Sequence, residues 1–106
     1  DMSVSTEHTA GCPEDLNLIA NVCRALSHVH RLSILSFVHA NPNCTAGALA
    51  AQLPIAASTV SQHLTLLRQS GLISCTHDGP RRRYRVEQDL LDRWADLAAI
   101  FVSSAP

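Results

Sequence analysis

Small hydrogen-bonding side chains are concentrated in one short stretch in the middle of the chain. Hydroxyl and amide groups at helical spacing can donate to and accept from base edges in the major groove of DNA. Gln62 is the best candidate for a base contact, because its amide can pair with adenine in a bidentate pattern. An ordinary solvated helix face is the alternative. The candidates in this stretch are Ser58, Thr59, Ser61, Gln62, His63 and Thr65.

Arginines follow this stretch closely. Residues 61–86 hold five Arg and one Asp, a net charge of +4, although the formal charge of the whole chain is -1. A basic patch beside a candidate recognition helix is where phosphate contacts are expected. The alternative role of these arginines is to keep a hairpin soluble. The candidates for phosphate or minor-groove contact are Arg68, Arg81, Arg82 and Arg83, with Arg85 next to them.

The four cysteines form no CxxC pair, which suits a reducing cytosol better than a disulfide-stabilised secreted protein. Cys23 lies on an apolar helix face and is predicted to be in the core, and a packing role is also predicted for Cys75. Cys44 is predicted at a helix start, where the helix dipole can lower the pKa of a thiol. Cys44 and Cys12 of opposite subunits can then form a disulfide or bind a soft ion such as As(III). No cofactor or metal is certain.

Two histidines, His28 and His30, begin a predicted helix. Because residues two apart on a helix point to different faces, capping or solvated roles are predicted for them rather than metal binding. The sequence has no Ser/His/Asp or Cys/His arrangement, no glycine-rich phosphate loop and no paired carboxylates at useful spacing, so an enzyme is not expected.

Two short helices joined by a tight turn position the candidate base contacts. Pro54 must end the first of them, since proline lacks the N–H of a helix interior and restricts the residue before it. The second helix, at residues 57–69, is the candidate recognition helix. The apolar positions are Ala46, Leu49, Ala50 and Leu53 in the first helix, and Val60, Leu64 and Leu67 in the second.

Two more helices are predicted before this unit. Pro13 suits a first helical turn, and the acidic residues after it are favoured at the positive end of the helix dipole. Ser27 is predicted to cap the next helix, which ends at residues 41–43. Residues 1–12 lack periodicity and are predicted to be a mobile arm. The apolar face of the first of these helices comprises Leu16, Ile19, Ala20, Cys23 and Leu26.

A β-hairpin and a last helix are predicted after the recognition helix. Apolar and polar residues alternate on both sides of Asp78-Gly79-Pro80, a strong turn signal. The apolar stripe of the last helix is too wide for one small core to cover, so part of it is expected to meet a second subunit. The residues predicted at this dimer interface are Leu16, Ile19, Leu90, Trp94, Leu97 and Phe101.

Length and composition agree with a single globular domain, placed at residues 13–103. The chain has 106 residues, of which 46% are hydrophobic and 16% charged. No apolar run is long enough for a membrane helix, and no export signal is visible, so a cytoplasmic protein without a membrane partner is expected. The fold class predicted is mainly α with a short β-hairpin, a winged helix-turn-helix in the order α-α-α-α-β-β-α.

The sequence resembles the arsenic-repressor (ArsR/SmtB-type) family of bacterial transcription repressors from about residue 16 to residue 101. The resemblance is carried by ALSHVHRLSIL at 25–35, STVSQHLTLLRQSGLI at 58–73 and GPRRRYRV at 79–86. It implies a homodimer that pairs through its first and last helices, binds an operator in double-stranded DNA and leaves it when an inducer binds. Thr45 and Gly47 stand where many metal-sensing members carry Cys-x-Cys, and the last helix has no histidine.

The sequence therefore predicts a homodimeric DNA-binding transcriptional repressor with a pseudo-palindromic operator, possessing thiols that can sense a soft metal, a metalloid or oxidation. The alternative is a winged-helix protein-interaction module without DNA binding, which the weak overall charge favours.

Overall fold

A computed structural model describes residues 12–104 of the chain. The predicted order of helices and hairpin is confirmed, with one short strand added. The predicted arm of residues 1–12 lies outside the described residues except for Cys12. The elements are α2 (Pro13–Ala25), α3 (Val29–Ala40), β1 (Cys44–Thr45), α4 (Ala46–Gln52), α5 (Ala57–Gln69), β2 (Ile73–Asp78), β3 (Arg81–Val86) and α6 (Gln88–Ser104).

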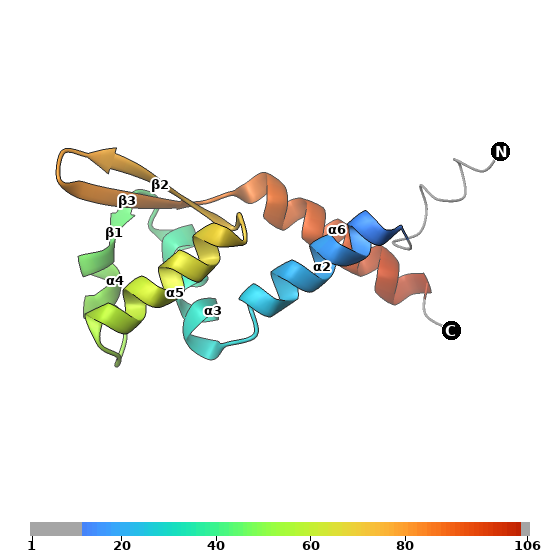
Figure 1. Ribbon diagram of the computed structural model, residues 1–106, viewed down its shortest axis with the longest axis horizontal. Helices are drawn as coiled ribbons and strands as arrows, with labels where there is room; N and C mark the ends of the chain where they lie inside the picture. The colour runs from blue at the N-terminus through green and yellow to red at the C-terminus, as the bar shows by residue number, and fades with distance from the viewer. Residues whose placement is uncertain (1–11, 105–106) are drawn as a thin grey trace.

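The molecule is elongated, with principal extents of 53 × 27 × 20 Å. In Figure 1, α4, α5 and the β2–β3 hairpin occupy one end, α2 and α6 cross at the other, and α3 lies between. An ion pair joins the crossing helices, with Arg93 Nη2 3.6 Å from Asp15 Oδ1. None of the helices in residues 12–104 is both long and apolar enough to cross a bilayer.

Side chains cap the starts of α2, α3 and α4. Pro13 is at the start of α2, where Cys12 Sγ accepts from the N–H of Asp15 at 3.4 Å. Thr45 Oγ1 accepts from the N–H of Ala48 at 3.2 Å and so caps α4.

The predicted cap of α3 was wrong, because His28 rather than Ser27 occupies this position. The Ser27 hydroxyl donates back to the Arg24 carbonyl at 2.7 Å and is therefore engaged at the end of α2. The His28 Nδ1 accepts from the N–H of His30 at 3.1 Å instead.

The candidate recognition helix, α5, begins and ends at sharp changes of chain direction. Before it, α4 stops ahead of Pro54, as predicted. Ala56 is the N-cap of α5 and supplies no side-chain hydrogen bond. After it, Gly71 has φ 85°, a left-handed conformation that favours glycine. A Cβ atom at Gly71 would lie 3.2 Å from Leu90 Cδ2, so the chain also passes close to α6 there.

The three strands form one antiparallel sheet in the order β1-β3-β2. The hairpin pairs Ile73 with Val86 and Asp78 with Arg81, which leaves a two-residue loop of Gly79 and Pro80. Gly79 has φ 61°, the positive angle that a tight hairpin turn requires at its first loop position. The sequence did not predict β1, because two residues are too few to show an alternating pattern.

The core lies where α3, α4 and α5 meet the base of the hairpin. The largest fully buried side chains include Ile34 of α3, Leu49 of α4 and Leu64 of α5. Leu90 and Trp94, predicted at a dimer interface, pack partly buried against this core. The buried apolar set is Val22, Ala25, Ile34, Leu35, Val38, Leu49, Val60, Leu64, Leu67, Leu72, Ile73 and Tyr84.

The prediction of Cys23 as a core residue was wrong, since its side chain is exposed. Helix α2 carries apolar residues on two faces, and Val22 and Ala25 are the ones that it buries. The face that carries Leu16 and Cys23 points outward, and Leu16 is 41% exposed.

Candidate nucleic-acid interface

The burial of one face of α5 turns its polar face to solvent. Val60, Leu64 and Leu67 are almost completely buried and fix the rotation of the helix about its axis. The opposite face therefore presents small polar groups without obstruction. Ser58, Ser61, Gln62, Thr65 and Arg68 are exposed, and Thr59 is half-buried.

Within this face, one hydrogen bond orients a candidate contact. The Thr65 hydroxyl donates to the Ser61 carbonyl at 3.0 Å, which leaves the lone pairs of its oxygen available to accept from another molecule. Arg68 lies in the last turn of α5, where a positive charge is favourable at the negative end of the helix dipole.

The structure places His63 away from the exposed face, which corrects the prediction that it belongs with the base contacts. Its side chain is only 8% exposed. The ring lies 4.8 Å from the ring of His28, centroid to centroid, and faces α3 rather than solvent. Burial, followed by the charges of His28, Arg31 and His30, lowers the pKa of His63 below its ordinary value.

The arginines of the hairpin separate into two groups. Arg81 and Arg82 are exposed beside the turn, and Arg85 is exposed further along β3. Arg83 is engaged within the protein, because its Nε lies 3.2 Å from Asp78 Oδ2 and its Nη1 donates to the Asn43 carbonyl at 3.2 Å. Arg83 therefore ties the hairpin to the turn before β1.

An open groove joins the hairpin to the recognition helix. Its lining includes Ser61 of α5, Arg81 and Arg82 of the hairpin, and residues 45–48 at the start of α4. Hydroxyl and guanidinium groups thus border one concave surface, a combination suited to a base edge and its neighbouring phosphate.

The position of Cys44 and the direction of its pKa shift both differ from the prediction. It lies in β1 and packs partly buried against the core. Desolvation by burial raises the pKa of its thiol, and a hydrogen bond to its own backbone opposes this only in part. The predicted lowering of this pKa was therefore wrong. Cys75 is half-buried against the same core, as predicted.

Cys12 lies far from Cys44 in the protomer. Cys12 precedes α2 and Cys44 is in β1, and Figure 1 shows these elements at opposite ends of the long axis. A bond between these two thiols within one protomer is therefore excluded by the described fold.

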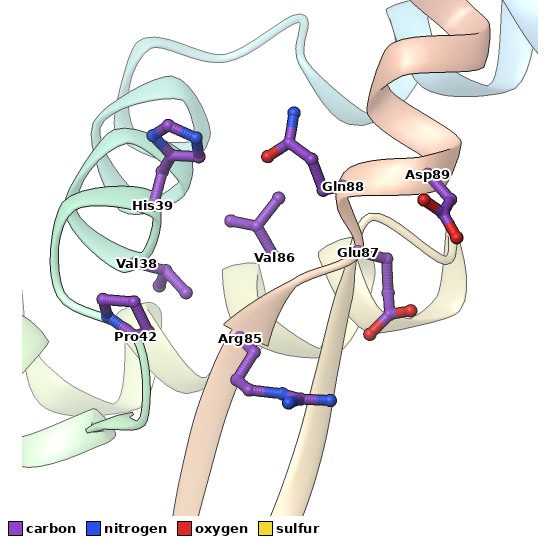
Figure 2. Close-up of a pocket in the computed structure, with 8 residues that line it drawn as sticks. All are labelled: Val38, His39, Pro42, Arg85, Val86, Glu87, Gln88 and Asp89. Carbon is purple, nitrogen blue, oxygen red and sulfur yellow. The ribbon is translucent and has the colours of Figure 1, made fainter.

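A second hollow lies between the end of α3 and the start of α6 (Figure 2). The ring of His39 and the amide of Gln88 lie on one side of Val86, whereas the charged ends of Glu87 and Asp89 lie on the other. Ligand groups do not converge there. Across residues 12–104, no three His, Cys, Asp or Glu side chains are arranged to hold a metal ion.

Comparison with known proteins places the helix-turn-helix unit in a family. The helix-turn-helix domain HTH_20 matches residues 26–76. The chain is 34% identical over 73 residues to the HTH-type transcriptional regulator YgaV of Escherichia coli, covering 69% of this chain and 74% of that protein.

Solved structures agree with this match. An ArsR-like transcriptional regulator from Rhodococcus sp. RHA1 superposes with a TM-score of 0.72 and 28% identity, covering 79% of this chain and 78% of that one. A possible ArsR-family regulator from Mycobacterium bovis, described as a homodimeric winged helix-turn-helix DNA-binding domain, has a TM-score of 0.66 and 27% identity over 80% of this chain and 79% of that one.

Proposed function

The chain belongs to the ArsR family of helix-turn-helix transcriptional regulators, and from this membership we propose that it is a homodimeric repressor of a pseudo-palindromic operator. Two copies of α5 enter successive major grooves, and the hairpins contact the flanking backbone. Half-sites then lie about one helical turn of DNA, or a multiple, apart. Its relatives are regulators of transcription rather than enzymes.

The observation that carries this proposal is the exposed polar face of α5 beside the arginine-lined groove. Ser58, Ser61 and Gln62 are held outward by a well-buried apolar face on the other side of the helix. Arg81 and Arg82 stand across the groove with exposed guanidinium groups. Base edges can be contacted from α5 while the arginines neutralise phosphates.

Dimerisation is supported by apolar side chains on the outer faces of α2 and α6. Leu16 is 41% exposed, Phe101 52% and Val102 72%. These residues belong to two helices that pack against each other at the end of the molecule away from the hairpin (Figure 1). A second copy that covers them would place the two recognition helices on the outer parts of a twofold assembly.

A thiol reaction between Cys12 and Cys44 is the route by which we propose that the operator is released. Cys12 and Cys44 would have to come from opposite subunits, and burial disfavours the thiolate of Cys44. Two thiolates suffice for a disulfide, whereas a soft metal such as As(III) is usually held by three. Gel mobility shifts with arsenite, copper(I) or diamide test this route, and unchanged operator affinity with all three removes it.

The proposed function is tested by selecting duplexes from a random DNA pool and measuring affinity for the selected sequence across salt concentrations. A pseudo-palindromic sequence with strongly salt-dependent affinity is expected. Arg82→Gln should lower the slope of log affinity against log salt by about 2, since one phosphate contact is lost in each of the two subunits.

Arg24→Gln is the matched control, because Arg24 is exposed in the last turn of α2, outside the groove, and its guanidinium donates to Asn21 Oδ1 of the same helix. It should leave the slope unchanged. Failure to enrich any duplex, together with no retention on heparin at low salt, would overturn the proposal and leave the protein-interaction module as the alternative.

A further inference from the structure

Three histidines from two helices meet behind the recognition helix. The ring centroid of His63 in α5 lies 4.8 Å from that of His28 and 6.1 Å from that of His30, and the latter two are 5.2 Å apart. His28 and His30 stand at the start of α3, and His28 is the cap outside the helix, which explains why both rings reach the same place.

Arg31 connects this cluster to a third helix. Its Nε donates to the Ala25 carbonyl at 2.6 Å and its Nη2 to the Arg24 carbonyl at 3.4 Å. Both carbonyls belong to the last turn of α2, where backbone acceptors lack partners within the helix. The Nη1 of the same guanidinium lies 3.4 Å from His63 Nδ1. One side chain therefore links α2, α3 and α5.

The Arg31–His63 contact requires a neutral imidazole. A guanidinium has N–H donors and no acceptor, so His63 Nδ1 can only accept in this pair. A proton on Nδ1 removes the lone pair and turns the contact into two facing cations at short range. The contact is lost when the ring is protonated.

Among residues 12–104, the groups whose charges act on His63 include no carboxylate that could compensate for such a proton. The charged groups that act on it are Arg31, His28 and His30, all of them cationic when charged. Of the other elements packed against α5, α4 has no titratable side chain. Strand β2 carries the thiol of Cys75, half-buried against the core, and the exposed side chains of His77 and Asp78 at its far end. The lowered pKa of His63 agrees with this surrounding.

We propose that Arg31 and His63 form a latch that fixes the recognition helix to α3 and to the end of α2 only while His63 is neutral. Acidification opens the latch, loosens α5 and lowers operator affinity. Because α2 carries part of the proposed dimer surface, the latch also ties the orientation of the recognition helix to the twofold assembly. The part that concerns DNA rests on the proposed function.

The test compares wild type with His63→Gln at about pH 7.5 and about pH 5.5, at constant ionic strength. The Gln side chain keeps an oxygen acceptor for Arg31 and does not titrate. Wild type should lose operator affinity on acidification, with a limiting slope of about two log units of Kd per pH unit, one proton for the His63 of each subunit. The loss should be much smaller in His63→Gln. His39→Gln, at an exposed histidine of α3, should behave as wild type.

Two measurements without DNA separate failure of the latch from failure of the proposed function. The ring proton resonances of His63 in the wild-type protein should titrate below the ordinary histidine pKa of about 6.5. Urea unfolding should show a loss of stability on acidification that His63→Gln reduces. An unshifted or raised pKa, or equal acid sensitivity of wild type and His63→Gln, overturns the latch. A wild-type affinity that rises in acid also overturns it.

Discussion

Gln62 is held on the exposed face of α5 by its buried neighbours, and within residues 12–104 its side chain makes no hydrogen bond to another residue. Its amide is therefore available for a base edge. Gln62→Ala should weaken operator binding by about 1–3 kcal/mol for each half-site and relax the preference at the matching base position of both half-sites. Anisotropy titrations with the selected duplex and single-base variants measure both effects.

Gln88→Ala is the control for this substitution, because Gln88 is exposed on α6, outside the groove. It should bind the operator as wild type does. Equal affinity of Gln62→Ala and wild type for every duplex would remove Gln62 from the interface.

The thiols of Cys23 and Cys44 should react at different rates. Cys23 is exposed, whereas Cys44 is half-buried and its pKa is raised by desolvation. At a pH near 8, about half a unit below the ordinary thiol pKa, desolvation therefore lowers the thiolate fraction of Cys44, and partial burial also limits access to its sulfur. Iodoacetamide labelling followed by peptide mass spectrometry should show Cys23 modified first. Faster labelling of Cys44 would contradict the ionisation assigned to it.

At the scale of single residues, sequence patterns predicted exposure well for the centre of the polar face and poorly at its edges. Ser58, Ser61 and Gln62 are exposed as predicted. His63 lies at the border between the two faces, where the neighbouring helix decides burial. The sequence of α5 does not indicate where α3 packs against it, so the contact between His63 and Arg31 could not be predicted.

At the scale of elements, the joint between α5 and β2 depends on Gly71. Gly71→Ala should destabilise the fold by about 1–2 kcal/mol, since the left-handed conformation is unfavourable for alanine and Leu90 would have to move. Gly47→Ala is the matched variant in a helix, where the nearest atom to a new Cβ is Thr45 Oγ1 at 3.9 Å. It should be neutral or stabilise by up to about 1 kcal/mol.

Denaturant unfolding of both variants measures these changes in the free energy of unfolding. Equal stability of Gly71→Ala and wild type would show that the joint relaxes without strain. A destabilised Gly47→Ala would mean that α4 is packed more tightly at its start than the described contacts indicate.

The helices and the hairpin could be predicted because each has a local signal. Pro13 and Pro54 mark helix boundaries, and Asp78-Gly79-Pro80 marks the hairpin turn. Strand β1 exists only through its pairing with β3, where Cys44 faces Tyr84. A two-residue strand is too short to show the alternation of apolar and polar residues by which strands are predicted from sequence. The wrong prediction for Cys23 has a related cause. Helix α2 has two apolar faces, and only its packing against the core determines which of them is buried.

At the scale of the whole molecule, the apolar end formed by α2 and α6 should decide the oligomeric state. Phe101→Glu places a charge on a side chain that is 52% exposed in the protomer. In a dimer that covers this position, burial of the charge should shift the protein to a monomer. Operator affinity should then fall strongly, because each half-site is bound alone. Analytical ultracentrifugation and operator titrations measure the two effects.

Val29→Glu is the control, since Val29 is 67% exposed at the start of α3, away from this end of the molecule. It should keep the association state of wild type. A Phe101→Glu protein that sediments as wild type would place the interface elsewhere.

The missing side-chain cap at Ala56 has a consequence for how this molecule can be improved. Ala56→Asp should stabilise the free protein by about 1 kcal/mol, because a carboxylate would accept from the first amide groups of α5 and suit the positive end of its dipole. The same carboxylate would occupy and repel the place where those amides can attract a phosphate. Ala56→Asp is therefore expected to raise the melting temperature and to lower operator affinity. Selection for melting temperature alone would yield a more stable protein that binds its operator less tightly.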